Sequence, residues 1–119
     1  MITGVHTLIY TKDPEGARAL FRDVFKFHSV DAGGGWLIFR APPGELACHP
    51  VDGDEGRHEA WFMCDDIRAT LGELAKGGVQ VSDSVSDRGW GIVSWFLLPG
   101  GEKMNLYQPK HPTAISAAT

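Results

Sequence analysis

The sequence predicts an α+β domain built from two βαβββ modules, and three observations indicate this fold. The chain has 119 residues with a hydrophobic fraction of 43% and a charged fraction of 22%, which suits a single domain with its own core. Strand-like and helix-like patterns alternate along it. The second half then repeats the order of the first, as expected for a duplicated unit.

The first half begins with a strand-like segment, residues 5–11, that is rich in β-branched and aromatic residues. A helix is expected next, because Asp13 suits its N-cap and Pro14 its first position. Apolar residues then recur at helical spacing. After a glycine-rich turn, one strand is expected to start near Trp36 and a short one to cover residues 44–50.

The same order returns after a polar connector. Residues 58–64 predict a strand, and the amphipathic helix that follows has an acidic start and a glycine stop at Gly77. Further strands are expected over residues 79–87, 90–101 and 102–109.

The two halves align residue by residue. Their opening segments match at a constant shift of 53 and their closing segments at a shift of 59, which pairs His6 with Glu59 and Leu46 with Asn105. We therefore predict one domain over residues 1–110, with module one at about 4–50 and module two at about 57–109. Residues 111–119 contain little to bury and are expected to form a flexible tail.

Composition and charge exclude several classes of protein. The net charge of −4 does not suggest a nucleic-acid partner. No apolar run approaches the length that spans a membrane, and the first residues lack the pattern of a secretory leader. Two cysteines, Cys48 and Cys64, do not make a disulfide framework. We expect a cytoplasmic protein with no membrane partner.

Three segments carry a resemblance to a known family. They read GVHTLIYTKDPEGARALFRDVF, HEAWFMCDDIRATLGELAKGGV and RGWGIVSWFLLPGGEKMNLYQP. Over residues 4–109 the chain resembles the vicinal oxygen chelate superfamily, which includes glyoxalases, bleomycin-resistance proteins and extradiol dioxygenases. The resemblance implies modules that curl around a cleft, a homodimer, and four metal-ligand positions in the members that bind metal.

Those four positions fall on His6, Leu46, Glu59 and Asn105. His and Glu are ordinary ligands of zinc, iron or manganese. Leu46 has no donor atom, and Asn105 offers a neutral oxygen only, whereas a catalytic site usually needs about three protein ligands. We therefore expect either no cofactor or a weakly bound divalent metal.

Side-chain alternation along the strands predicts the lining of the cleft. On this basis Tyr10 shares the face of His6, while Trp61 and Met63 share the face of Glu59. Tyr107 shares the face of Asn105, and Trp90, with a glycine on each side, is expected at the mouth of the cleft. A lining of this kind suits a flat organic molecule.

The sequence leaves three functions open. We favour a protein that binds a small, aromatic organic molecule in the cleft. The first alternative is a metal-dependent isomerase, lyase or dioxygenase that acts on adjacent oxygens. The second is a metal-free enzyme in which His6 and Glu59 are the catalytic base and its orienting partner; a purely structural hydrogen bond between these two residues is equally compatible with the pattern.

Overall fold

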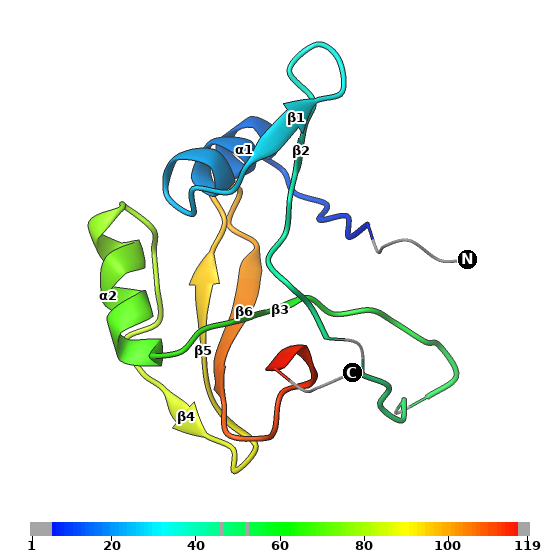
Figure 1. The fold of residues 1–119 in the computed structure, drawn as a ribbon, viewed down its shortest axis with the longest axis vertical. Coiled ribbons are helices and arrows are strands. Elements are labelled where there is room, and N and C mark those ends of the chain that lie inside the picture. Colours follow the sequence, from blue (N-terminus) through cyan, green and yellow to red (C-terminus); the bar gives the residue numbers. More distant parts are fainter. Residues whose placement is uncertain (1–5, 46, 52, 117–119) are drawn as a thin grey trace.

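A computed structural model describes residues 6–45, 47–51 and 53–116 of the chain (Figure 1). A short 3-10 helix at Ala114–Ser116 ends the described part. The α+β class is confirmed. The helices are α1 (Pro14–Asp23) and α2 (Ile67–Lys76), and the strands are β1 (Ser29–Asp31), β2 (Leu37–Phe39), β3 (Trp61–Met63), β4 (Ser86–Asp87), β5 (Gly91–Leu97) and β6 (Lys103–Pro109).

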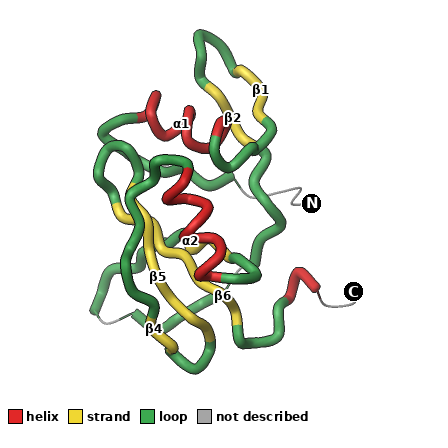
Figure 2. Tube along the Cα trace, turned by 90° about the vertical axis from the view of Figure 1, so that its left-hand side faces the viewer, coloured by secondary structure: helices red, strands yellow, loops and turns green. Residues whose placement is uncertain are grey.

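The second module has the predicted βαβββ order. Its strands form a four-stranded sheet in the order β3-β6-β5-β4. β3 runs parallel to β6, while β5 is antiparallel to both of its neighbours. Helix α2 lies against β5 and β6 (Figures 1 and 2). One face of this sheet is therefore covered by a helix, and the opposite face is left for the site.

Local hydrogen bonds begin both helices where the sequence predicts. The Gly16 N–H donates to the carboxylate of Asp13 at 2.9 Å, and the Ala69 N–H donates to that of Asp66 at 3.1 Å. Such an N-cap contributes about 1 kcal/mol. Gly77 closes α2 as expected.

Helix α1 ends in an unusual way. The Phe27 N–H donates to the Phe21 carbonyl, six residues earlier in the chain, at 3.0 Å. The residue before it, Lys26, has φ of 61°. Glycine normally occupies this left-handed position, because a Cβ is strained there. A lysine thus holds a conformation that its own side chain disfavours.

The core lies between the two helices and the helix-covered face of the sheet. Phe96 is fully buried, and its ring lies 5.7 Å from that of Phe25 and 5.8 Å from that of Phe62. Module one therefore contributes its helix to the core of module two. The buried cluster consists of Leu20, Ile67, Leu71, Leu74, Phe96, Leu98, Met104 and Leu106.

The first module is less complete than the second. β1 and β2 form a two-stranded antiparallel ladder that projects beyond α1 at the top of Figure 1. Two segments predicted as strands, residues 5–11 and 44–50, form no strand where they are described, and Val5 and Leu46 lie outside the described residues. A strand needs a neighbour for its backbone groups, and the described residues of one copy supply none there.

One carboxylate fixes the start of module one on module two. Glu102, in the turn between β5 and β6, accepts hydrogen bonds from the Thr11 hydroxyl at 2.7 Å and the Lys12 N–H at 2.9 Å.

In the second module, the strand predicted over residues 79–87 is reduced to β4 and a single bridge between Val81 and Phe96. No helix in the described part of the chain is long and apolar enough to cross a bilayer.

Candidate functional site

The face of the sheet opposite α2 gathers five residues that the sequence assigns to ligand binding. Trp61 and Met63 on β3 lie beside Asn105 and Tyr107 on β6 in the strand register. Trp90, just before β5, completes the set through ring contacts. Neighbouring residues in register point to the same side of a sheet. We call these five residues the aromatic face.

Three rings of the aromatic face meet edge to face. The ring centroids of Trp61 and Trp90 are 5.8 Å apart, those of Trp61 and Tyr107 are 5.8 Å apart, and those of Trp90 and Tyr107 are 5.5 Å apart. The angles between the ring planes range from 68° to 88°. Tyr107 is 9% exposed and Trp90 is 45% exposed, so Trp90 presents the most accessible ring to an incoming molecule.

A glycine makes room for the Tyr107 ring. A Cβ placed on Gly91 would lie 2.8 Å from Cδ2 of Tyr107 and 3.1 Å from the Gln108 carbonyl oxygen. Real Cβ atoms do not approach other atoms this closely, so the ring rests against the bare backbone of β5. Gly91 is therefore required by the packing of the site.

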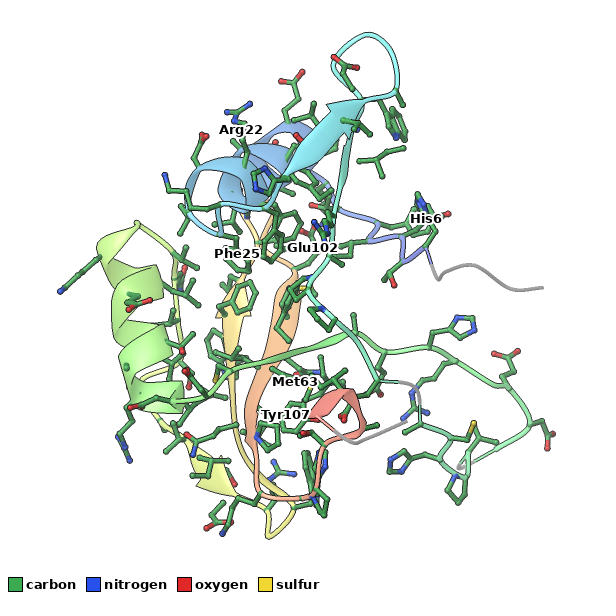
Figure 3. The ribbon with its side chains drawn as sticks, in the orientation of Figure 1. His6, Arg22, Phe25, Met63, Glu102 and Tyr107 are labelled. Atoms are coloured by element: carbon green, nitrogen blue, oxygen red, sulfur yellow. The ribbon has the colours of Figure 1, made fainter. Side chains whose placement is uncertain are left out.

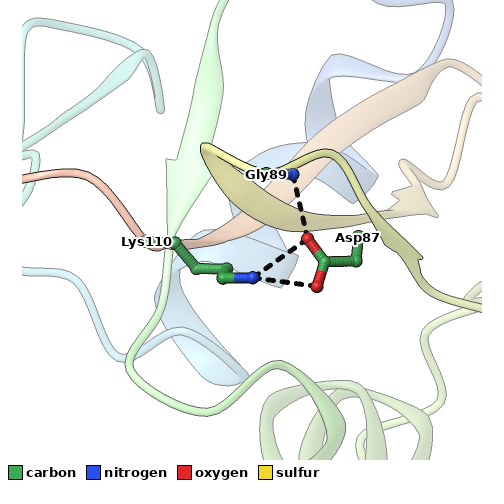
Figure 4. Close-up of polar contacts among 3 residues, drawn as sticks. All are labelled: Asp87, Gly89 and Lys110. Carbon is green, nitrogen blue, oxygen red and sulfur yellow. Dashed lines mark hydrogen bonds and ion pairs between the residues drawn. The ribbon is translucent and has the colours of Figure 1, made fainter.

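The turn that carries Trp90 is tied to the end of β6. Asp87 accepts a hydrogen bond from the Gly89 N–H at 2.9 Å and binds Lys110 Nζ at 2.9 Å (Figure 4). The Lys110 N–H also donates to the Trp90 carbonyl at 2.9 Å. These bonds lower the pKa of Asp87, mainly through the Lys110 contact. They hold Trp90 over the strands that bear the other rings.

Glu59 supports Trp61. The Trp61 Nε1–H donates to Oε2 of Glu59 at 2.9 Å, and Arg57 Nε donates to Oε1 at 3.1 Å. The bond from Trp61, followed by that from Arg57, lowers the pKa of Glu59. Glu59 is therefore ionised at neutral pH, and each of its oxygens already has a partner.

His6 and Tyr10 lie apart from the aromatic face. Figure 3 shows His6 on the N-terminal segment, at a distance from Met63 and Tyr107. Tyr10 is 87% exposed. Within the described ranges, no hydrogen bond or ion pair joins His6 to Glu59. One copy of the chain thus brings together five of the six predicted ligand-binding residues but not the predicted catalytic pair.

The residues at the four family metal positions do not fit a metal centre in one copy. Glu59 is bonded to Arg57 and Trp61, Asn105 has only a neutral oxygen, and Leu46 lies outside the described residues. Among the residues that the structure describes, no three His, Cys, Asp or Glu side chains gather closely enough to hold an ion.

Sequence reasoning missed His111. Its ring lies against that of Tyr107 with centroids 5.9 Å apart, and its Nε2 is 3.1 Å from the Tyr107 hydroxyl. Burial raises the pKa of Tyr107, and the charge of Glu45 raises it further. Glu45 also accepts a hydrogen bond from the Ala114 N–H. The residues after β6 carry no periodic pattern, so no sequence signal placed them at the site.

A separate hollow of about 470 Å³ lies beside α1 and the β5–β6 turn, away from the aromatic face. Its wall includes glycine backbone at Gly16 and Gly77 and apolar side chains such as Leu20, with Asp23 as its charged group. This lining offers little for recognition of a polar ligand. The aromatic face is the better candidate because its residues combine rings with polar groups.

The comparisons with known proteins agree with this fold. Residues 4–101 match the model of the Glyoxalase/Bleomycin resistance protein/Dioxygenase superfamily, and the chain belongs to that superfamily. The resemblance described from the sequence is thereby confirmed. The search of curated proteins returned no match.

Several solved structures share the fold. TnmS3, an antibiotic binding protein from Streptomyces sp. CB03234, is 24% identical with a TM-score of 0.64, over 92% of this chain and 98% of that one. Lactoylglutathione lyase from Agrobacterium tumefaciens is 17% identical with a TM-score of 0.59, over 89% and 92%. An integron cassette protein from the mobile metagenome of Halifax Harbour Sewage Outfall is 16% identical with a TM-score of 0.62, over 90% and 99%.

Proposed function

We propose that the protein binds a small aromatic organic molecule on the aromatic face. The observation that carries the proposal is the cluster of Trp61, Trp90 and Tyr107, in which Trp90 remains 45% exposed. An exposed tryptophan held in fixed geometry loses little conformational freedom on binding. Contact between aromatic rings adds about 0.5–1.5 kcal/mol beyond the burial of their area.

Polar groups beside the rings give the face a means of orienting its ligand. Asn105 is half-buried next to Trp61, and its amide can both donate and accept. The Tyr107 hydroxyl lies at the edge nearest to His111. A few fixed polar groups in an apolar surround are the usual composition of a small-molecule site. The description of TnmS3 as an antibiotic binding protein supports binding as the function.

The enzymatic alternatives have weaker support. Lactoylglutathione lyase is among the structures with this fold, but the residues that would hold a metal do not converge in one copy of this chain. The acid–base alternative needs a free carboxylate at Glu59, whose oxygens are bonded to Trp61 and Arg57. Sequestration of the ligand without turnover is therefore the function we favour.

We further propose that two copies associate. Residues 6–13, which precede α1, form no strand ladder, and they expose 62% of Leu8 and 87% of Tyr10. β3 stands at the edge of its sheet. Unpaired backbone and exposed apolar residues are costly to leave in water, and a second copy offers matching groups.

Cys48 and Cys64 are both free thiols, which suits a reducing, cytoplasmic environment.

Calorimetric titration tests the binding proposal. The probes are 2-naphthol and, as a non-aromatic comparison, cyclohexanol. We expect saturable binding of 2-naphthol, no measurable binding of cyclohexanol, and at least about a tenfold loss in Trp90→Ala. Trp36→Ala is the matched control, because Trp36 is 61% exposed but lies outside the aromatic face.

Two results would contradict the proposal. If Trp36→Ala weakens binding as much as Trp90→Ala, the probe does not use the aromatic face. If the protein consumes 2-naphthol during incubation, as measured by chromatography of the recovered probe, the protein is an enzyme for that probe and not a binder.

A further inference from the structure

His111 reaches the aromatic face from the segment that follows β6, and both of its ring nitrogens have partners. Nε2 lies 3.1 Å from the hydroxyl oxygen of Tyr107. Nδ1 lies 2.7 Å from the carbonyl oxygen of Pro112. The two partners differ in kind, because a hydroxyl can donate or accept whereas a carbonyl oxygen can only accept.

The Pro112 carbonyl therefore determines the tautomer of His111. Nδ1 must carry the hydrogen in order to donate it to that carbonyl. In a neutral imidazole, Nε2 is then a lone-pair acceptor. The Tyr107 hydroxyl consequently donates its hydrogen to His111. Its oxygen keeps lone pairs for a further partner but has no hydrogen left to offer.

The phenol hydrogen of Tyr107 is available for this bond. Burial and the nearby charge of Glu45 both raise the pKa of Tyr107, so the hydroxyl stays protonated near neutral pH. The carboxylate of Glu59 accepts hydrogen bonds from Trp61 and Arg57.

The segment that carries His111 is held in place by contacts that do not involve the His111 side chain. Lys110 binds Asp87 and donates its N–H to the Trp90 carbonyl (Figure 4). Further along, the Ala114 N–H donates to the carboxylate of Glu45. Substitution of His111 should therefore change the hydrogen bond to Tyr107 without releasing the segment.

We propose that His111 is a positioning residue that makes the aromatic face selective for ligands with a hydrogen-bond donor. Because the hydrogen of Tyr107 is committed to His111, the Tyr107 oxygen accepts an O–H or N–H group from the ligand. A carbonyl or ether oxygen at the same place would leave two acceptors facing each other without a hydrogen between them. The inference rests on the proposed binding function, and it names the ligand class as hydroxylated or amino-substituted aromatic molecules.

A pair of probes tests this selectivity. 2-Naphthol and 2-methoxynaphthalene share one ring system, but the ether lacks the donor. Their affinities are measured by calorimetry for the wild type, for His111→Phe, which keeps an aromatic ring but removes Nε2, and for Tyr107→Phe, which removes the oxygen. The preference for 2-naphthol should be about two- to tenfold greater in the wild type than in either variant, as expected for one hydrogen bond.

An independent readout comes from the free protein. Long-range ¹H–¹⁵N correlation spectra identify which nitrogen of each histidine carries the hydrogen. We expect Nδ1–H for His111 in the wild type. A hydrogen on Nε2 would overturn the inference, because Tyr107 would then be the acceptor in this bond.

The remaining outcomes separate the inference from the proposed function. If His111→Phe weakens both probes equally and leaves their preference unchanged, His111 is merely structural and the inference fails while the binding function stands. If neither probe binds the wild type, the proposed function fails and the ligand class falls with it. A preference that disappears in both variants supports the inference.

Discussion

Trp61 and Glu59 are two residues apart in the chain, and the indole N–H of Trp61 donates to Oε2 of Glu59 at 2.9 Å. A carboxylate that the sequence marks as a candidate catalytic group thus orients a ring of the aromatic face. The contact is only partly shielded, since the Glu59 side chain is 45% exposed. It is an orienting bond more than a source of stability, and exposed charged contacts contribute at most about 1 kcal/mol.

Acidification should release Trp61 from Glu59. The pKa of Glu59 is lowered in the folded protein, mainly by Trp61. Its contribution to stability is therefore present above the ordinary glutamate pKa of about 4.3 and is lost as the pH falls through the lower, folded value. The indole N–H signal of Trp61 should shift in this acidic range in a pH-dependent NMR titration. In Glu59→Gln the shift should be absent, and a shift that persists there would assign it to another group.

Gly91→Ala should damage the site and the fold together. The added Cβ would meet the Tyr107 ring at 2.8 Å, and overpacking of this kind costs about 1–3 kcal/mol. Urea unfolding measures the loss, and 2-naphthol binding should weaken in parallel. Gly72→Ala in α2 is the matched control, since its Cβ meets nothing within 4 Å. That variant should gain about 0.5–1 kcal/mol, and equal effects of the two substitutions would refute the packing argument.

Lys26→Gly should stabilise the protein. Lys26 holds φ of 61° after α1, and the left-handed region costs an ordinary residue about 1–2 kcal/mol. Part of this gain is offset by the flexibility of glycine in the unfolded chain, which leaves a net increase of about 0.5–1 kcal/mol. Thermal unfolding of Lys26→Gly and Lys26→Ala distinguishes backbone strain from loss of the side chain. A higher melting temperature in Lys26→Ala than in Lys26→Gly would contradict the prediction.

Tyr10→Asp should break the proposed association of two copies. Tyr10 is 87% exposed on the unpaired segment before α1, and a charge placed in an apolar interface would be desolvated without a partner. Sedimentation of the wild type should give the mass of two chains, and that of Tyr10→Asp the mass of one. Arg22→Asp is a charged control on the exposed side of α1. A wild type that sediments as a single chain at micromolar concentration would refute the association.

The sequence predicts most of what depends on neighbouring residues. Asp13 caps α1 as predicted, because an N-cap bond spans three residues. Period-two alternation likewise placed Trp61, Asn105 and Tyr107 on one side of the sheet. Each of these features follows from a local rule, so one sequence was sufficient to find them.

Features that depend on distant partners were harder to predict. The pairing of His6 with Glu59 assumes that the opening strands of both modules are complete, and in one copy the first remains unpaired. The role of His111 depends on a chain reversal after β6 that brings its ring onto Tyr107. No spacing rule describes such a reversal, because it is set by anchors such as Lys110.

Glu102 accepts hydrogen bonds from Thr11 and Lys12, and these bonds join the two modules. The two modules therefore have different structural roles. Module two forms a four-stranded sheet. Module one contributes its helix to the core of module two, and its own strands lie at the periphery. The two modules are similar in length, but we expect them to tolerate substitutions to different degrees. The peripheral strands β1 and β2 can change in sequence, whereas the four-stranded sheet that carries the aromatic face must be preserved.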